Sequence, residues 1–435
     1  MCKCPSKEQT AAGLSTTLGI KIPESISLHE KDTLQTLAKK VAELASRPIE
    51  QEKAALWTAH NDLKGTPRPL IFCDPENGWN EIITQEQILC TSPLLRVWEM
   101  HLRKEIHWAE NFQDDKVIEP YFNVPYHYTD SGYGLQEEVI SGGEEGSYKY
   151  KHPITDYAEH FEKLHFQEFD IDHESTNKVL NLAKELFGDF LTVRLKGIWW
   201  WTLGMTWDFI KLRGLENLML DTLMYPDDVH RLMGFLRDAT MHKLDFFEQN
   251  GLLSSNTEGT YVGSGGFGWT TELPSSIELD RNITTKDMWG FCDSQETVGV
   301  SPESFGEFIF PYQKPIMERF GLSCYGCCEP LDLRWHLIKD TKGLRRVSIS
   351  PWADVKKMAE YLGKDFIYSR KPSPMPLANP NPDWDSIRKE LREFIQATKD
   401  CHVEIIMKDN HTLGHNPTNA DTWCKIARQE IARRS

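Results

Sequence analysis

The sequence predicts an α/β fold, a closed (β/α)8 barrel of the TIM type with an N-terminal helical extension. Short apolar runs, about eight or nine of them, alternate with amphipathic helical patterns along most of the chain, which indicates a parallel sheet with right-handed crossovers. Such regular alternation favours a closed barrel over an open doubly wound sheet. The glycine-rich segment 263–268 gives no support to the open alternative, because it lacks the Walker lysine and matches no dinucleotide fingerprint.

Composition limits the class of protein. The chain has 435 residues, 40% of them hydrophobic and 26% charged, as in ordinary globular proteins. A net charge of −16 argues against nucleic-acid partners and against an anionic membrane surface. Neither a signal-peptide core nor an apolar run of about 18 residues is present, so no membrane span and a cytoplasmic location are expected. Ten cysteines are too sparse for a disulfide framework and favour metal or redox chemistry.

The elements follow in chain order. Residues 1–27 are expected to form a loose leader and residues 28–435 a single barrel domain, with an insertion at about 125–160 that is rich in Gly, Tyr and Glu. The pattern from 27 to 57 is helical and is divided by Pro48. Strands are expected at 68–73, 117–124, 190–195, 257–262, 288–292, 322–325, 344–349, 366–369 and 403–407. Helices are expected at 85–112, 175–187, 206–250, 302–320, 332–339, 353–362, 384–398 and 418–432.

The residues that follow the strands are the candidates for chemistry, since a barrel of this type has its active site at the carboxyl ends of its strands. Three consecutive tryptophans follow the strand at 190–195 and cannot all face one core, so at least one is expected to line the site. The glycine-rich segment 263–268 is expected to be a flexible lid, with a structural loop as the alternative. Other strands are followed by Asp293, Trp352, Arg370, Lys371, Lys408, Asp409 and His411.

A cluster of thiols follows the strand at 322–325. Cys324, Cys327, Cys328 and Glu329 lie within six residues. A Cys-x-x-Cys pair can be redox-active, but the third thiol and the carboxylate have no role in that chemistry. An open catalytic zinc site needs three protein ligands and can take them from different strands, with His411 or Asp409 as the distant candidates. A catalytic metal, a redox pair and buried structural cysteines therefore all remain open.

The order of motifs in the second half of the chain resembles the uroporphyrinogen decarboxylase superfamily. The resemblance rests on Trp289–Pro302, Phe308–Ile316, Cys324–Leu331 and Ser348–Trp352, and its best match is the corrinoid-associated methyltransferase branch. It covers roughly residues 30–433. The resemblance implies a (β/α)8 barrel, in agreement with the alternation of strands and helices.

Two departures from the family pattern bear on function. Decarboxylase members bind their polycarboxylate substrate with an arginine-rich segment after the first strand, whereas Phe72–Trp79 is acidic here and would repel it. Methyltransferase members carry a His-x-Cys-Gly motif, which falls on Tyr325–Cys328. Cys327 therefore takes the place of a zinc-ligating cysteine, while the histidine falls on Tyr325. The resemblance implies a metal site in which Cys328, Glu329 and His411 complete the ligands around Cys327.

The function implied by the resemblance is that of a metal-assisted methyltransferase. It would move a methyl group between a small methylated substrate, such as an aryl methyl ether in O-demethylation, and a corrinoid cofactor. The chain has no Asp-x-His-x-x-Gly motif, so the cobalamin would come from a partner corrinoid protein or free. Zinc would act as a Lewis acid on the substrate heteroatom. A homodimer is the expected assembly.

The residues expected to serve this function fall into three groups. Proton transfer is assigned to Asp293, Asp409 and Lys408, and the metal to the four ligands named above. The residues expected to bind the substrate are Trp199, Trp200, Tyr325 and Trp352. The alternative activity is that of a metal-free decarboxylase or lyase using Asp293, Lys371 and Lys408. A barrel that binds a corrinoid or a small molecule without catalysis is the third hypothesis.

Overall fold

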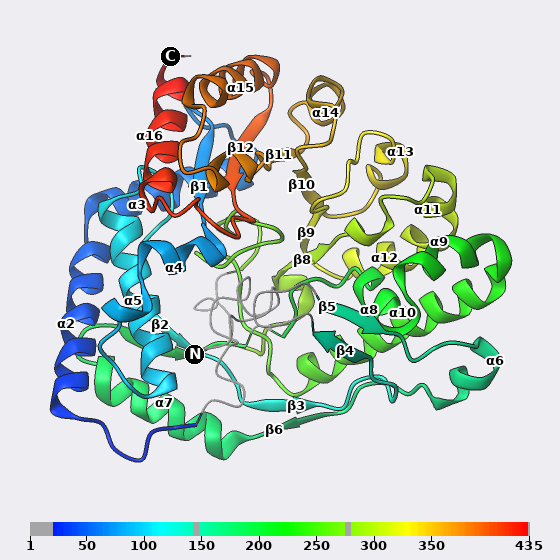
Figure 1. Ribbon diagram of the computed structural model, residues 1–435, viewed down its shortest axis with the longest axis horizontal. Coiled ribbons are helices and arrows are strands. Elements are labelled where there is room, and N and C mark those ends of the chain that lie inside the picture. Colours follow the sequence, from blue (N-terminus) through cyan, green and yellow to red (C-terminus); the bar gives the residue numbers. More distant parts are fainter. Residues whose placement is uncertain (1–20, 142–147, 198, 275–279, 434–435) are drawn as a thin grey trace.

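A computed structural model describes residues 21–141, 148–197, 199–274 and 280–433. Residues 1–20, most of the expected leader, lie outside the described residues, and residues 21–27 have no regular secondary structure. Helices surround the strands in the ribbon diagram (Figure 1). No helix of the described residues is long and apolar enough to cross a membrane.

The centre of the fold is a six-stranded parallel sheet with the order β1-β12-β11-β10-β9-β8. Its first strand in the sequence pairs with its last, with Phe72 opposite Ile406, as the strands of a barrel do. All of these strands are almost completely buried, which explains their continuous apolar runs. The strands are β1 (Leu70–Cys73), β8 (Trp289–Cys292), β9 (Leu322–Tyr325), β10 (Leu344–Ile349), β11 (Ile367–Arg370) and β12 (His402–Met407).

Two further strands, β2 (Tyr121–Val124) and β7 (Thr192–Leu195), form a separate parallel pair. Single backbone hydrogen bonds connect the segments beside this pair to the main sheet. Asp115 N donates to Ile71 O at 2.8 Å, and Leu203 N donates to Phe291 O at 3.0 Å. No continuous ladder joins the two sheets in the described part of the chain, so the fold is α/β with a parallel central sheet and a closed barrel is not shown.

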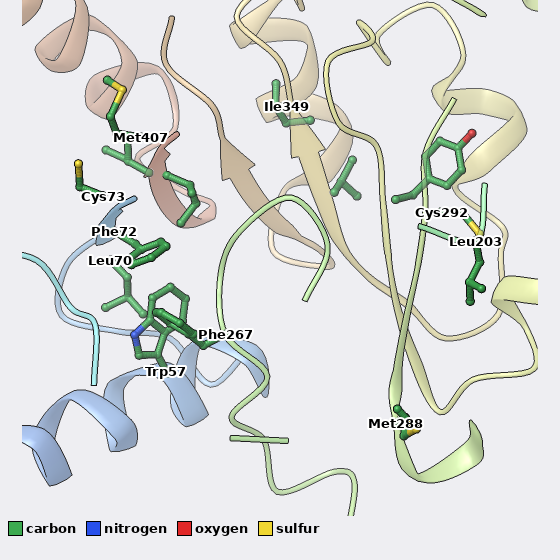
Figure 2. Close-up of a cluster of buried hydrophobic side chains, with 14 of the residues drawn as sticks. Trp57, Leu70, Phe72, Cys73, Leu203, Phe267, Met288, Cys292, Ile349 and Met407 are labelled. Carbon is green, nitrogen blue, oxygen red and sulfur yellow. The ribbon is translucent and has the colours of Figure 1, made fainter. Parts of the chain in front are cut away.

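The prediction of a strand at 257–262 is wrong. Only an isolated bridge between Tyr261 and Phe267 forms there. Gly263, Gly265 and Gly266 have φ angles of 69°, 117° and 83°, a left-handed backbone that reverses the chain and breaks any ladder. After the reversal, Phe267 packs at 5.1 Å from Trp57 and 4.9 Å from Phe72, measured between ring centroids (Figure 2). The glycine-rich segment is therefore a buried structural loop, the alternative to the expected lid.

The expected N-terminal helical extension is confirmed as α2 (Leu28–Ala45) and α3 (Pro48–Asn61). A capping box starts α2, in which Ser27 Oγ accepts from Glu30 N at 3.2 Å and Glu30 Oε2 accepts from Ser27 N at 3.1 Å. Pro48 begins the second helix, where its missing N–H has no cost. The last turns of α3 face the sheet, because Trp57 and His60 are fully buried.

Two expected long helices are divided in the structure. Gly214, with φ 104°, and Pro226 split the pattern at 206–250 into three helices, and the pattern at 302–320 forms two. The helices after α3 are α4 (Trp79–Ile82), α5 (Pro93–Glu110), α6 (Tyr157–His160), α7 (His173–Phe187), α8 (Thr206–Arg213), α9 (Leu215–Met224), α10 (Pro226–Gln249), α11 (Pro302–Phe308), α12 (Phe310–Met317), α13 (Trp335–Ile338), α14 (Val355–Leu362), α15 (Trp384–Ala397) and α16 (Thr418–Ala432).

The insertion expected at about 125–160 contains short antiparallel pairs instead of parallel strands. β3 (Tyr128–Asp130) pairs with β6 (Phe169–Ile171), and β4 (Glu138–Ser141) pairs with β5 (Tyr148–Lys151). The segment thus extends to residue 171, and Figure 1 shows β3 and β6 at the edge of the fold, away from the six-stranded sheet.

Candidate functional site

The carboxyl ends of the central strands gather the candidate residues. Asp293 follows β8, Cys327 follows β9, Lys371 follows β11 and Lys408 follows β12. Their electrostatic effects show that they share one neighbourhood: Asp293 acts on the pKa of Cys327, while Cys327 and Lys408 both act on the pKa of Lys371. Trp201 and Cys328 pack against the apolar cluster that contains Cys327.

Asp293 is a buried carboxyl with one oxygen unused. Thr202 Oγ1 donates to its Oδ1 at 2.7 Å. Its Oδ2 is buried and has no hydrogen-bond partner among the residues that the structure describes. Burial raises the pKa of Asp293 well above its usual value, and the carboxylates of Glu296 and Glu329 raise it further. Burial therefore favours the protonated form of this side chain, which can give a proton through Oδ2.

The backbone around Asp293 is fixed by close packing. Gln313 Nε2 donates to Asp293 O at 2.8 Å and to Gly204 O at 2.6 Å, which holds the loops after β8 and β7 together. A Cβ atom at Gly204 would lie 2.1 Å from Asp293 O, so only glycine fits at this position. The carboxyl group is thus held by residues far apart in the sequence.

Glu329 and Tyr325 connect loops. Glu329 is fully buried, and its Oε1 accepts from Ser294 N at 2.8 Å while its Oε2 accepts from Cys327 N at 2.9 Å. Tyr325 is also fully buried, and its hydroxyl donates to Gln313 Oε1 at 2.7 Å. Both side chains hold the strand ends in place. The substrate-binding role expected for Tyr325 stays a prediction without a contact to support it.

Two adjacent thiols lie at the end of β9. Cys327 Sγ and Cys328 Sγ are 3.7 Å apart. The hydrogen bond with Cys328 raises the pKa of Cys327 well above its usual value, and burial raises it further. Cys324 is buried inside the strand, and burial raises its pKa to about 12. In this arrangement Cys324 and Cys327 are neutral thiols near neutral pH.

The expected zinc ligands are not assembled. His411 is on an exposed loop, with its Nδ1 3.4 Å from Asn77 Nδ2, and both carboxylate oxygens of Glu329 accept backbone N–H groups. Within the described ranges, no three His, Cys, Asp or Glu side chains are placed to hold a metal ion. The residues as arranged do not fit a three-ligand zinc site. Zinc binding by Cys327, Cys328, Glu329 and His411 stays a prediction.

Two buried lysines differ in their partners. Lys371 Nζ donates to Ser369 Oγ at 2.8 Å, and burial lowers the pKa of Lys371 to about 8. Lys408 Nζ lies 2.9 Å from Glu76 Oε1 and 5.1 Å from the centre of the Trp201 ring. Burial alone would lower the pKa of Lys408, but the charges of Glu76 and Asp409 outweigh it and raise the pKa. Lys408 is therefore a paired cation with no proton to release near neutral pH.

Strained and unpartnered groups lie beside these lysines. Glu76, after β1, and Asp409, after β12, have φ angles of 51° and 62°, which is uncommon for residues with side chains. Asn410 is buried, and neither its Nδ2 nor its Oδ1 has a hydrogen-bond partner among the described residues. Sequence reasoning passed over Asn410, because an amide after a strand looks like any loop residue.

The tryptophan that lies beside the cysteines is not one of those expected to bind the substrate. Trp199 is buried, donates from Nε1 to Leu252 O at 2.9 Å and stacks on Phe247 at 4.2 Å, so it belongs to the core. Trp200 is half-buried, and Trp352 is 72% exposed. Trp201 is the one of the three consecutive tryptophans that packs beside the cysteines. The sequence indicated that one of the three lines the site, but the choice depends on the course of the loop.

A network of buried charged groups lies beneath the site. Glu404, on β12, is fully buried and accepts from Ser369 Oγ at 2.6 Å, while its other oxygen is 3.1 Å from His60 Nε2. Arg346 Nε lies 3.0 Å from Glu404 Oε1, an ion pair without hydrogen-bond geometry. Arg346 Nη2 donates to Asn61 Oδ1 at 2.6 Å. These groups join α3 to the sheet.

Comparison with known proteins gives one structural match to report. No protein-family model and no curated protein matches the chain in sequence. Several solved structures match, and one is a methyltransferase from Methanosarcina mazei with 12% sequence identity. The alignment covers 87% of this chain and 98% of that chain, with a TM-score of 0.49. A match at this level does not establish function, and the resemblance to the uroporphyrinogen decarboxylase superfamily stays a prediction.

Proposed function

We propose that this protein is an enzyme that transfers a methyl group from a small methylated substrate to a corrinoid carried by a partner protein or free. The observation that carries the proposal is Asp293, a buried acid with an unused oxygen beside the Cys327 and Cys328 thiols. The resemblance of the motifs around Cys327 to corrinoid-associated methyltransferases supplies the reaction class. The geometry supplies a group that the reaction needs.

Removal of a methyl group from oxygen needs a proton for the leaving group. In the proposed step the bond between the methyl carbon and the oxygen breaks, and the methyl group passes to the reduced cobalt, which donates the electron pair. The leaving oxygen takes the proton from Asp293 Oδ2 and leaves as an alcohol or phenol. Thr202 Oγ1, 2.7 Å from Asp293 Oδ1, then stabilises the carboxylate that remains. Solvent returns the proton to Asp293 after the product has left.

An aryl methyl ether is the substrate proposed in more detail. Trp201 and Phe291 lie 5.3 Å apart between ring centroids, beside the apolar cluster that contains Cys327. Aromatic rings in this geometry offer a surface on which a third ring can pack. Aromatic side chains near the acid thus support a substrate whose methyl group is bound to a phenolic oxygen.

Whether zinc assists the reaction is a separate question, because the proposed step does not involve zinc. Metal analysis of the purified protein decides it. One equivalent of zinc that is lost in Cys327→Ser supports zinc assistance through a rearranged ligand set. Absence of zinc, together with full activity of Cys327→Ser, excludes zinc assistance. We also propose a cytoplasmic location, a homodimer and a partner corrinoid protein.

A decarboxylase or lyase reaction is the second candidate, and Lys371 favours it. A buried lysine whose pKa is lowered to about 8 can act as a nucleophile or a base near neutral pH. With Asp293 as the proton donor, such a site could act on a small non-porphyrin acid without any cobalt. The third hypothesis, a binding protein without catalysis, needs neither group.

A substrate panel separates these functions. The protein is incubated with reduced cobalamin and a series of methylated aromatics, amines and thiols, and the absorption change of the cobalt is followed. We expect methylcobalamin to form from at least one aryl methyl ether. Formation of carbon dioxide from an aryl acid without methylcobalamin would favour the decarboxylase, and no turnover of any compound would favour a binding protein.

A further inference from the structure

The loop 263–266 packs against the central sheet mainly through its backbone, because three of its four residues are glycines. A Cβ atom at Gly263 would be 2.7 Å from Cys324 Sγ on β9. A Cβ atom at Gly265 would be 2.4 Å from Ile406 Cγ2 on β12, and one at Gly266 would be 2.6 Å from Glu404 Oε1. Glycine is therefore required at positions 263, 265 and 266 for two reasons: the loop backbone packs directly against the sheet, and all three residues have positive φ angles.

This close approach leaves backbone donors unused. All four loop residues are buried. Among the hydrogen bonds of the described residues, none is donated by the backbone N–H of Gly263, Ser264, Gly265 or Gly266, although Val262 N and Gly268 N both donate. Buried N–H groups nearly always have a partner, so a cluster without one indicates a missing acceptor. Successive N–H groups in left-handed backbone are known to form concave anion sites.

A buried cation, Lys371, is linked to this loop through Ser369 and Glu404. A Cβ atom at Gly266 would meet Glu404 Oε1, and this oxygen accepts from Ser369 Oγ at 2.6 Å. Ser369 Oγ in turn accepts from Lys371 Nζ at 2.8 Å. Lys371 is 6% exposed, and in the described part of the chain no carboxylate oxygen lies within ion-pair distance of its Nζ. A buried ammonium with donors to spare favours an anion as its partner.

The charged groups around Lys371 are already paired with one another. Glu404 on β12 is the counter-charge of Arg346, and Glu76 is the counter-charge of Lys408. The other groups that act on the pKa of Lys371 are the buried thiols Cys324 and Cys327. Glu404 also favours the charged form of Lys371, but it forms its ion pair with Arg346, so no carboxylate of the described residues is paired with Lys371 alone.

We infer that the loop 263–266 and Lys371 form an anion-binding subsite that takes the carboxylate of a small organic substrate. The inference rests on the proposed function in one respect, since it assigns the carboxylate to the methylated substrate of the same site. It narrows that substrate to a methylated organic acid. Lys371 then binds and orients the substrate, while Asp293 handles the proton.

Calorimetric titration of the full chain tests the subsite with benzoate as the probe and benzamide as its neutral counterpart. We expect benzoate to bind at least tenfold more tightly than benzamide to the unaltered protein at about pH 7, because only benzoate supplies an anion. Equal affinities, or no binding of benzoate, would overturn the inference. This comparison needs no variant and so does not depend on whether a variant folds.

Variants locate the subsite. Lys371→Met should weaken benzoate binding at least tenfold, Lys371→Arg should keep it within about threefold, and Lys364→Met, at an exposed lysine, should leave it unchanged. Unchanged benzoate binding in Lys371→Met would overturn the role of this lysine. Circular dichroism confirms that each variant is folded.

Methyl transfer to reduced cobalamin separates this inference from the proposed function. We expect 4-methoxybenzoate to react at least tenfold faster than anisole at equal low concentration. Equal rates would keep the proposed function and overturn the subsite. Tight benzoate binding with no methyl transfer from any acid would keep the subsite and overturn the proposed function.

Discussion

Glu404 and Asp293 are both buried carboxyl groups on strands, or strand ends, of the same sheet, yet their surroundings differ. Glu404 contacts Ser369, His60 and Arg346. Burial alone would raise its pKa, but Arg346, His60 and Lys371 lower it to about 2. Asp293 has one hydrogen bond, from Thr202, and like charges nearby, so its pKa is raised well above the usual value.

The different surroundings of the two carboxyl groups indicate a structural role for one and a chemical role for the other. A carboxylate whose partners are all supplied by the protein stabilises the fold and has nothing left to offer a substrate. An acid whose charged form is penalised by burial costs stability, and such a cost is typical of catalytic groups. Glu404 therefore joins α3 to the sheet, whereas Asp293 is the candidate for proton transfer.

Glu404→Gln should have the largest effect on stability. The substitution leaves Arg346 buried without its counter-charge, so we expect the free energy of unfolding to fall by about 3–5 kcal/mol. Urea denaturation at about pH 7 measures it. Glu390→Gln is the control, because Glu390 pairs with Arg370 at 3.5 Å from a position that is 52% exposed, and it should cost less than about 1 kcal/mol. A comparable loss in both variants would contradict the assignment.

Lys371→Met should stabilise the protein. Burial lowers the pKa of Lys371 from 10.5 to about 8, which at about 1.4 kcal/mol per pH unit corresponds to a cost on the order of 3 kcal/mol for the charged form. The unfolded chain binds this proton more tightly, so the wild type gains stability as pH rises from about 8 to 10.5. The extra stability of the variant should be complete below about pH 8 and should disappear above about pH 10.5. Urea denaturation of both proteins below and above this pH range measures it. A gain that does not vary with pH would point to packing instead.

Asp293→Asn should also stabilise the protein at neutral pH, because burial penalises the charged form of this carboxyl group. Because the folded pKa is raised, the folded protein binds the proton more tightly, and the wild type loses stability as pH rises above 3.8, the usual pKa of an aspartate. The advantage of the variant should therefore vanish in acid. Asp287→Asn provides the contrast: Arg281 lowers the pKa of Asp287 to about 2, so this variant should lose stability at neutral pH. Melting temperatures of both variants across the pH range test the signs.

The sequence predicted the central strands well and for a physical reason. β9 and β10 lie at 322–325 and 344–349 as expected, since fully buried strands appear as apolar runs bounded by turn residues. The segment 257–262 has the β-branched and aromatic residues of a strand but forms none. The glycines after it reverse the chain, and their requirement for positive φ is a three-dimensional fact that strand propensity does not contain.

The site could be predicted only in part. Asp293, Lys408 and the cysteines were found because each follows a strand whose position the pattern gives. Glu404 was missed, since its partners His60 and Arg346 are 344 and 58 residues away in the sequence, by numbering, and no local pattern connects them. Trp201 was missed for a similar reason, because the path of the loop decides which of three neighbouring tryptophans lies at the site, and the sequence does not show that path.

The most direct test of the account is the rate of methylcobalamin formation from reduced cobalamin and an aryl methyl ether at about pH 7. The unaltered protein should catalyse it, and Asp293→Asn should lower the rate about 100-fold or more while remaining folded, because the amide gives no proton to the leaving oxygen. Asp114→Asn, which removes another buried carboxyl group, should keep the activity. An Asp293→Asn protein as active as the wild type would contradict the account.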